Sequence, residues 1–243
     1  MTRALRRFSC FVALVAGLAL MGGVGPVRAH PPAELDWQLN ARERHFQALD
    51  RPTPSFDLLD ADGSPVSLIG LAGKVVVVNF IYTHCPDVCP LHAEKIAAIQ
   101  GLVNQTAMRN HVRFVTINTD SARDSPDVLR AYDPQHGLDP ANWVFLTSGQ
   151  DRPDRTRRPV EAFGHRFVAT SDGLQMHGLV THVIDRDGRL RANFHGLDFD
   201  DANLVLFVTT VAGHEHTSAA SDRNSVPPTA SYWARLRGAV LQW

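Results

Sequence analysis

The sequence predicts one α/β domain with a mixed sheet flanked by helices. Two runs of valine, isoleucine and aromatic residues, 74–82 and 111–119, have the composition of buried strands, and helical periodicity follows the first of them. A third observation is the Asp187-Gly188 turn between segments 178–185 and 189–196, which predicts a hairpin. Strands that alternate with helices and then end in a hairpin and a last helix are typical of this class.

The first half of the domain begins with a hairpin, because the Asp62-Gly63 turn separates two apolar patches. The run 74–82 is almost unbroken valine, asparagine and aromatic residues, the pattern of a central strand covered on both faces. Pro90 then suits the first turn of a helix. Apolar residues repeat at helical spacing behind it, at Ile96, Ile99 and Val103.

The second half continues the alternation. The strand at 111–119 leads to a helix that begins within 124–132, where Ser125 is the expected N-cap and Pro126 takes the first helical position. Three further elements complete the domain: a short strand at 143–146, an arginine- and proline-rich helix at 151–163, and a closing helix at 201–213.

The first 29 residues predict an export signal or a membrane anchor. Three arginines precede the apolar stretch Phe8–Met21, and a small-residue cleavage site ends at Ala29. The alternative is an uncleaved anchor over residues 8–27. Both interpretations place the rest of the chain in the periplasm, or on the extracytoplasmic face of the membrane, because the arginines stay inside.

The remaining segments have distinct compositions. Residues 30–52 form a polar lead-in, 53–213 the folded domain, and 214–243 a polar tail that is expected to be flexible. The chain carries 24 basic and 25 acidic residues, and no basic run indicates nucleic acid as a partner. Cleavage after Ala29 removes four arginines and no acid, so the processed chain carries a net charge of −5.

Two of the three cysteines, Cys85 and Cys89, follow the central strand at the start of a helix. In open α/β sheets this carboxyl edge is where ligands bind. A helix N-terminus lowers the pKa of thiols, so both can act as nucleophiles or as metal ligands. A disulfide that closes so short a loop adds little stability, which argues against a purely structural bridge.

The pair of thiols suits a soft metal or a redox reaction. Thiolates select Cu(I) and also suit zinc, and a third imidazole ligand would make a trigonal site that accommodates Cu(II) as well. A structural zinc site would need two histidines besides Cys85 and Cys89. The sequence therefore leaves a copper site, a zinc site and a redox pair open.

Several of the twelve histidines are candidates for the third ligand. His84 is expected to be solvated, and His92 to be exposed on the helix. His177 lies in a loop before the second hairpin, whereas His182 shares a strand face with Val180 and Ile184 and is expected to be a packed core residue. Three others lie in segments without the support that fixes a ligand: His30, His214 and His216.

The quoted features resemble those of the Sco/SenC family of copper proteins. The resemblance rests on "GKVVVVNFIYTHCPDVCP", "FVTINTDSARDSPDVLRAYD" and "HGLVTHVIDRDGRLRANF", and it covers about residues 54–212. It implies a thioredoxin-like mixed sheet with an N-terminal hairpin extension. Carried over residue by residue, it implies a copper ion held by Cys85, Cys89 and His177, since His177 stands eleven residues before Gly188. Met176, beside it, is expected to pack rather than to bind.

The resemblance also implies a function. The chain would carry Cu(I) or Cu(II) to the dinuclear copper site of cytochrome c oxidase, with the copper-bearing subunit as partner and a second copper chaperone or a thiol reductant as further partners. Such a chaperone needs no chemical transformation of a substrate, which favours a protein that is not an enzyme, and a thiol-disulfide reductase activity is compatible with it. The alternative is a thiol-disulfide oxidoreductase in which Cys85 attacks and Cys89 resolves. Against it, the spacing is Cys-x3-Cys and no proline precedes Gly178. A peroxidase is disfavoured by the position of Thr83.

Overall fold

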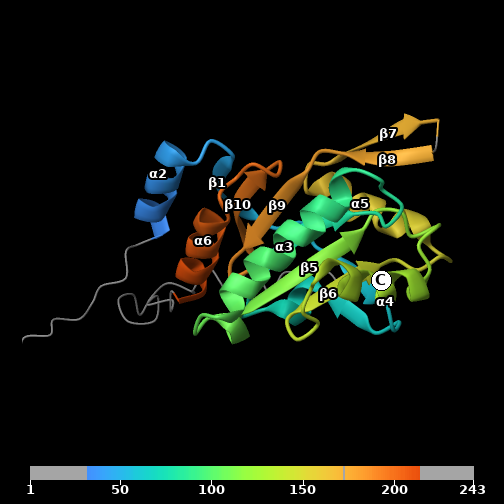
Figure 1. Cartoon of the computed structure of the whole chain (residues 1–243), viewed down its shortest axis with the longest axis horizontal. Coiled ribbons are helices and arrows are strands. Elements are labelled where there is room, and N and C mark those ends of the chain that lie inside the picture. The colour runs from blue at the N-terminus through green and yellow to red at the C-terminus, as the bar shows by residue number, and fades with distance from the viewer. Residues whose placement is uncertain (1–31, 172, 214–243) are drawn as a thin grey trace, which may run out of the picture. The chain divides into compact units, whose positions relative to one another are not determined.

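The computed structural model describes residues 32–171 and 173–213, and an eight-stranded mixed sheet lies at the centre of this part (Figure 1). The strand order is β1-β10-β9-β4-β5-β6-β2-β3, and a separate two-stranded sheet pairs β7 with β8. The strands are β1 (Phe46–Pro52), β2 (Asp57–Asp60), β3 (Pro65–Ser67), β4 (Val75–Ile81), β5 (Val112–Asn118), β6 (Trp143–Thr147), β7 (Arg166–Thr170), β8 (Gly173–His177), β9 (Val180–Ile184) and β10 (Arg189–His195).

Helices connect and cover these strands. The α-helices are α2 (Pro32–Arg42), α3 (Val88–Asn104), α4 (Pro126–His136), α5 (Arg157–Ala162) and α6 (Asp201–Gly213). Three short 3-10 helices are η1 (Leu68–Leu71), η2 (Arg109–His111) and η3 (Pro153–Arg155). The helices predicted after the first two strands and at the chain's folded end are therefore present, and Ser125 is the cap of α4, since its hydroxyl accepts from the Val128 amide at 3.4 Å.

The fold class predicted from the sequence is confirmed. Strands β4 and β5 are parallel and joined through α3, whereas β9 runs antiparallel to β4 and forms a hairpin with β10 before α6. This order, β10-β9-β4-β5, is the thioredoxin-like arrangement. The predicted N-terminal hairpin is present as β2–β3 and extends the sheet beyond β6.

Strand β4 is buried along its whole length, as the valine run predicts. Alternate side chains enter two different cores, because successive residues of a strand point to opposite faces. Val75 and Val77 pack in the cluster that contains the buried faces of α3, α4 and α6. Val78 and Phe80 pack in the second cluster, which contains residues of η1 and α5. The carboxyl end of β4 is thus fixed from both sides.

The sheet begins earlier than the boundary at residue 53. Leu35 and Leu39, one helical turn apart in α2, are buried in the main core together with Phe46 of β1. Strand β1 pairs with β10, from Phe46↔Phe194 to Pro52↔Arg189. Residues 30–52 have a polar composition because only one face of α2 and of β1 is apolar.

Two further details differ from the sequence-based expectation. The helix expected at 151–163 is divided into η3 and α5, each of which has a proline in its first turn, at Pro153 and Pro159. The β7–β8 hairpin was not predicted, and it projects away from the main sheet (Figure 1).

The expected export segment 1–29, His30 and the tail with His214 and His216 lie outside the described residues. Within the described ranges, no helix combines the length and the apolar composition that crossing a bilayer requires.

Candidate metal centre

The two cysteines meet at the carboxyl end of β4. Cys85 lies in the loop that leaves this strand, and Cys89 is the second residue of α3. Pro90 follows in the first turn, where a missing amide hydrogen costs no helical hydrogen bond. Both thiols are free and nearly buried, and their side chains are hydrogen-bonded to each other. The structure therefore brings together two of the three predicted ligands.

The surroundings of Cys85 favour its thiolate. Burial raises the pKa of this thiol, but hydrogen bonds outweigh burial and lower the pKa below its usual value. The donors are the backbone amides of Asp87 and Cys89, at the start of α3, followed by the side chains of Cys89 and Tyr82. The amides are among those that a helix N-terminus leaves without a partner in the helix, as the sequence analysis expects.

Cys89 is held in the opposite state, so the prediction that both thiols have a lowered pKa is wrong for Cys89. Burial raises the pKa of its thiol to about 12, and only the backbone of Tyr82 opposes this. The nearby Cys85 thiolate and the carboxylate of Asp124 raise the pKa further. One thiol of the pair is therefore ready to ionise, whereas the second ionises only when a cation compensates the extra negative charge.

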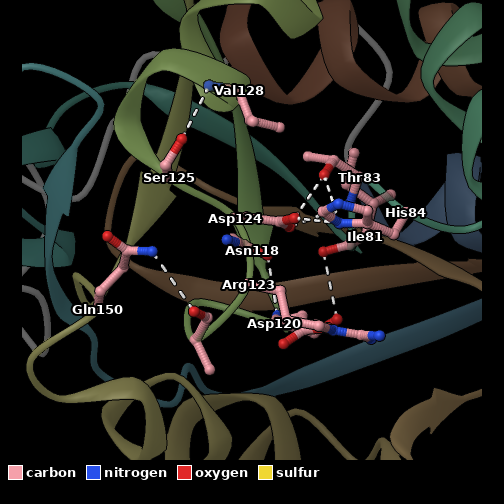
Figure 2. Close-up of polar contacts among 12 residues, drawn as sticks. Ile81, Thr83, His84, Asn118, Asp120, Arg123, Asp124, Ser125, Val128 and Gln150 are labelled. Carbon is pink, nitrogen blue, oxygen red and sulfur yellow. Dashed lines mark hydrogen bonds and ion pairs between the residues drawn. The ribbon is translucent and has the colours of Figure 1, made fainter. Parts of the chain in front are cut away.

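A buried carboxylate holds the loop in front of Cys85 (Figure 2). Asp124, between β5 and α4, accepts from the Thr83 amide at 3.0 Å and from the Thr83 hydroxyl at 2.5 Å. Nδ1 of His84 lies 2.7 Å from the same carboxylate. His84 is exposed to solvent, as predicted, but its ring also contacts a buried acid, which the sequence did not indicate.

The loop that carries Asp124 is also bound to β4. The Thr119 amide donates to the Ile81 carbonyl at 2.8 Å, and Arg123 pairs with Asp120 within the same loop (Figure 2). From the sequence, Asp124 is expected only to begin the helical segment 124–132. A feature of the sequence that indicates its role is its position, directly before the Ser125 cap and after a buried strand. A carboxylate at this position lies at the same edge of the sheet as the cysteines.

The expected exposure of His92 is also wrong. Its ring is completely buried, and Nε2 lies 2.8 Å from the Thr181 hydroxyl. His92 follows Cys89 by three positions and precedes Ile96 by four, so all three share the buried face of α3. Burial lowers the pKa of His92 to about 3. His92 is therefore a neutral core residue.

His182 is a packed core residue, as predicted. It is 1% exposed, and its ring packs against Phe163 with ring centroids 4.9 Å apart. Burial, followed by the neighbouring His165, lowers its pKa well below the usual value.

His177 is the last residue of β8 rather than a loop residue. Strand β9 pairs with β4 from Val76↔Ile184 to Val78↔His182, and the same register continued places Val180 opposite Phe80. The backbone of residue 177 therefore arrives at the sheet edge from which Cys85 and Cys89 emerge. The side chains of His177 and Met176 lie outside the described residues, and among the described side chains no group of three or more metal-ligating residues gathers. The third ligand stays a prediction.

In a thioredoxin-like domain, two hydrogen-bonded thiols at the carboxyl edge of the sheet have the chemistry for metal binding or for redox reactions. The comparison with protein families makes this specific. The sequence model of the SCO1/SenC family matches residues 46–210. The chain belongs to the SCO1/SenC family.

Individual relatives agree with this membership. The chain is 31% identical over 179 residues to Protein SenC of Rhodobacter capsulatus. The aligned region covers 72% of this chain and 77% of the relative. Among solved structures, a SCO1/SenC family lipoprotein from Bacillus anthracis has a TM-score of 0.61 and 24% identity, covering 68% of this chain and 98% of the other. ScoI of Bradyrhizobium japonicum, solved with copper bound, has a TM-score of 0.54 and 25% identity, covering 66% and 99%.

Proposed function

We propose that this chain binds one copper ion through Cys85, Cys89 and His177 and delivers it to the dinuclear copper site of cytochrome c oxidase. The ion is cargo, so no covalent transformation of a substrate is required. Binding takes place outside the cytoplasmic membrane, in the periplasm or at the membrane's outer face, where the N-terminal 29 residues direct or anchor the chain.

The observation that carries the proposal is the contact between two buried, free thiols at the carboxyl end of β4. Soft sulfur donors select Cu(I) among the common metal ions, and an imidazole added to two thiolates suits both oxidation states of copper. The copper-bound relative from Bradyrhizobium japonicum shares this fold and family and supports the choice of metal. With two cysteines available, a closed zinc site would need two histidine ligands, whereas a copper site needs one.

The charge state of the thiols fits a carrier. The lowered pKa of Cys85 provides one thiolate, and the raised pKa of Cys89 keeps the second sulfur protonated until a cation arrives. Copper binding would therefore release a proton from Cys89, and protonation of that sulfur would favour release of the ion.

Copper titration of the reduced full chain tests the proposal. We expect one Cu(I) per chain, measured in competition with a Cu(I) chelator, and loss of this binding in Cys85→Ser and in Cys89→Ser. His177→Ala should weaken Cu(II) binding by more than about 100-fold, since losing a ligand costs more than losing a ligand's support. His111→Gln, which removes an exposed histidine, is the matched control.

Two results would contradict the proposal. Copper binding that survives either serine substitution would exclude the thiol site. Binding that is unchanged in His177→Ala would exclude the third ligand. Delivery is tested separately, by mixing the loaded chain with the copper-free, reduced copper-bearing domain of cytochrome c oxidase and following transfer of the ion.

A second function is favoured by the difference between the two thiols. A cysteine with a lowered pKa beside one with a raised pKa is typical of thiol-disulfide oxidoreductases, with Cys85 as the attacking thiol and Cys89 as the resolving thiol. The substrates would be cysteines of the oxidase copper site or of another exported protein. Catalysed reduction of a disulfide substrate that is indifferent to His177→Ala would favour this function.

A further inference from the structure

Two buried histidines contact each other beneath the hairpin that carries His177. Nε2 of His165 lies 2.9 Å from Nε2 of His182, and both rings are almost fully buried, at 5% and 1% exposure. Buried polar side chains cost free energy unless each is hydrogen-bonded, so a pair of this kind calls for an explanation. Neither histidine is a proposed copper ligand.

His165 closes the base of the β7–β8 hairpin. It directly precedes Arg166, the first residue of β7, whose partner in the hairpin is His177 at the end of β8. The ring of His165 donates a hydrogen bond to the backbone carbonyl of Gly178, the residue that follows His177. One side chain thus joins the two ends of the hairpin at the position of the proposed ligand.

Gly178 lies directly beside the His165 ring, since a Cβ added to this glycine would be in ordinary contact with Nδ1, at 3.6 Å. Its φ of 105° is in the region that favours glycine. The rings of His165 and His182 meet through their Nε2 atoms, with their planes nearly perpendicular at 80°.

His182 connects this base to the main sheet. It lies in β9, and its Nδ1 is 2.7 Å from Oδ1 of Asn193 in β10. The Asn193 amide donates in turn to Gln47 of β1 at 3.1 Å. His165 also packs against Phe80, with ring centroids 4.6 Å apart, and Phe80 belongs to the strand that leads to Cys85.

We propose that the buried His165–His182 pair positions the third copper ligand, by fixing the base of the β7–β8 hairpin, and with it His177, to the strands that carry the cysteines. This inference rests on the proposed function. Because the β7–β8 hairpin forms a sheet of its own, it has no strand pairing that would fix residue 177 relative to Cys85. The histidine pair supplies that connection. His165 and His182 are positioning residues that act through His177.

The test separates positioning from a structural role by using two oxidation states of copper. Cu(I) needs the two thiolates above all, whereas Cu(II) needs the imidazole. In the full chain, His165→Leu should lower Cu(II) affinity about 10- to 100-fold, the range expected for loss of a ligand's support, and should change the Cu(II) electron paramagnetic resonance spectrum. Cu(I) affinity should stay within about threefold, since the cysteine surroundings are unchanged.

A double-mutant cycle sharpens the test. If His165 acts through His177, adding His165→Leu to His177→Ala should cause no further loss of Cu(II) affinity. His165→Gln is the second variant should the leucine variant fail to fold, because its amide can contact His182 but is not placed to donate to Gly178. His111→Gln, again, should bind both ions as the parent chain does.

The outcomes are distinguishable from failure of the proposed function. If the parent chain binds copper and His177→Ala weakens Cu(II) binding, but His165→Leu and His165→Gln do not, the positioning role is wrong and the copper site stands. An equal loss of Cu(I) and Cu(II) affinity, or a loss that persists in the His177→Ala background, would also overturn it. If the parent chain binds no copper, the proposed function itself fails.

Discussion

Replacing Asp124 with alanine should loosen the loop in front of Cys85. The substitution leaves the Thr83 amide without an acceptor and removes the charge-assisted bond from the Thr83 hydroxyl. An orphaned, partly buried donor costs about 1–3 kcal/mol, and a hydrogen bond to a charged group contributes about 1.5–3 kcal/mol. The bond to His84 adds little, because that ring is half exposed to water. After allowing for relief of the buried charge, we expect a loss of about 3 kcal/mol.

Thermal and urea unfolding of the copper-free chain measure this loss. For a domain of this size, about 3 kcal/mol corresponds to a fall of about 6–12 °C in the unfolding midpoint. Asp127→Ala is the matched control, since Asp127 lies three residues further along, in the first turn of α4, is 92% exposed and pairs with the exposed Arg130. If Asp124→Ala and Asp127→Ala unfold at the same temperature, Asp124 does not hold the cysteine loop and the reasoning fails.

Three further predictions concern other parts of the domain. The pKa of His92 is about 3 in the folded state and near 6.5 in the unfolded chain. When the pH drops below about 6.5, the unfolded chain therefore binds a proton that the folded chain does not, and the free energy of unfolding decreases. His92→Gln should therefore lose about 2 kcal/mol less than the parent chain between about pH 7 and pH 5 in urea unfolding, and an identical pH profile would contradict this. Alkylation of the reduced chain, followed by peptide mapping, should modify Cys85 before Cys89, and the reverse order would refute the assignment of their pKa directions. A fragment of residues 32–213 should unfold cooperatively, whereas a fragment of residues 53–213 should not. The shorter fragment lacks three buried apolar side chains, each of which contributes about 1.5–3 kcal/mol to stability. A cooperative transition in both fragments would show that α2 and β1 are dispensable.

The elements that the sequence predicted best are those with a strong local signal. Strand β4 is an unbroken apolar run, and the turn at Asp187-Gly188 fixes the β9–β10 hairpin. The position of Cys85 and Cys89 followed from these elements, because they come directly after β4 and before a helix with a clear apolar repeat. In these cases one segment determined its own structure.

The errors concern residues whose environment depends on distant partners. Strand β1 is mostly exposed, and it is a strand because β10 offers it an unpaired edge. Asp124 is buried because Thr83, forty-one residues earlier, supplies two donors. The helical spacing alone predicts that His92 is buried, since it lies on the same helix face as Ile96. A polar residue on an apolar face needs a hydrogen-bond partner, however, and this partner, Thr181, is 89 residues away in the sequence.

The separate β7–β8 sheet has a consequence for how an ion would leave the protein. Gly164 and Gly178, with φ of 101° and 105°, stand at the two ends of this hairpin. Because the hairpin shares no ladder with the eight-stranded sheet, swinging it outward would break the His165–His182 contact but no strand pair of that sheet. The sulfur atoms stay fixed to β4 and α3 meanwhile. With His177 as the third ligand, release of the ion would move only this hairpin, and the copper-free chain would bind a further ion without refolding.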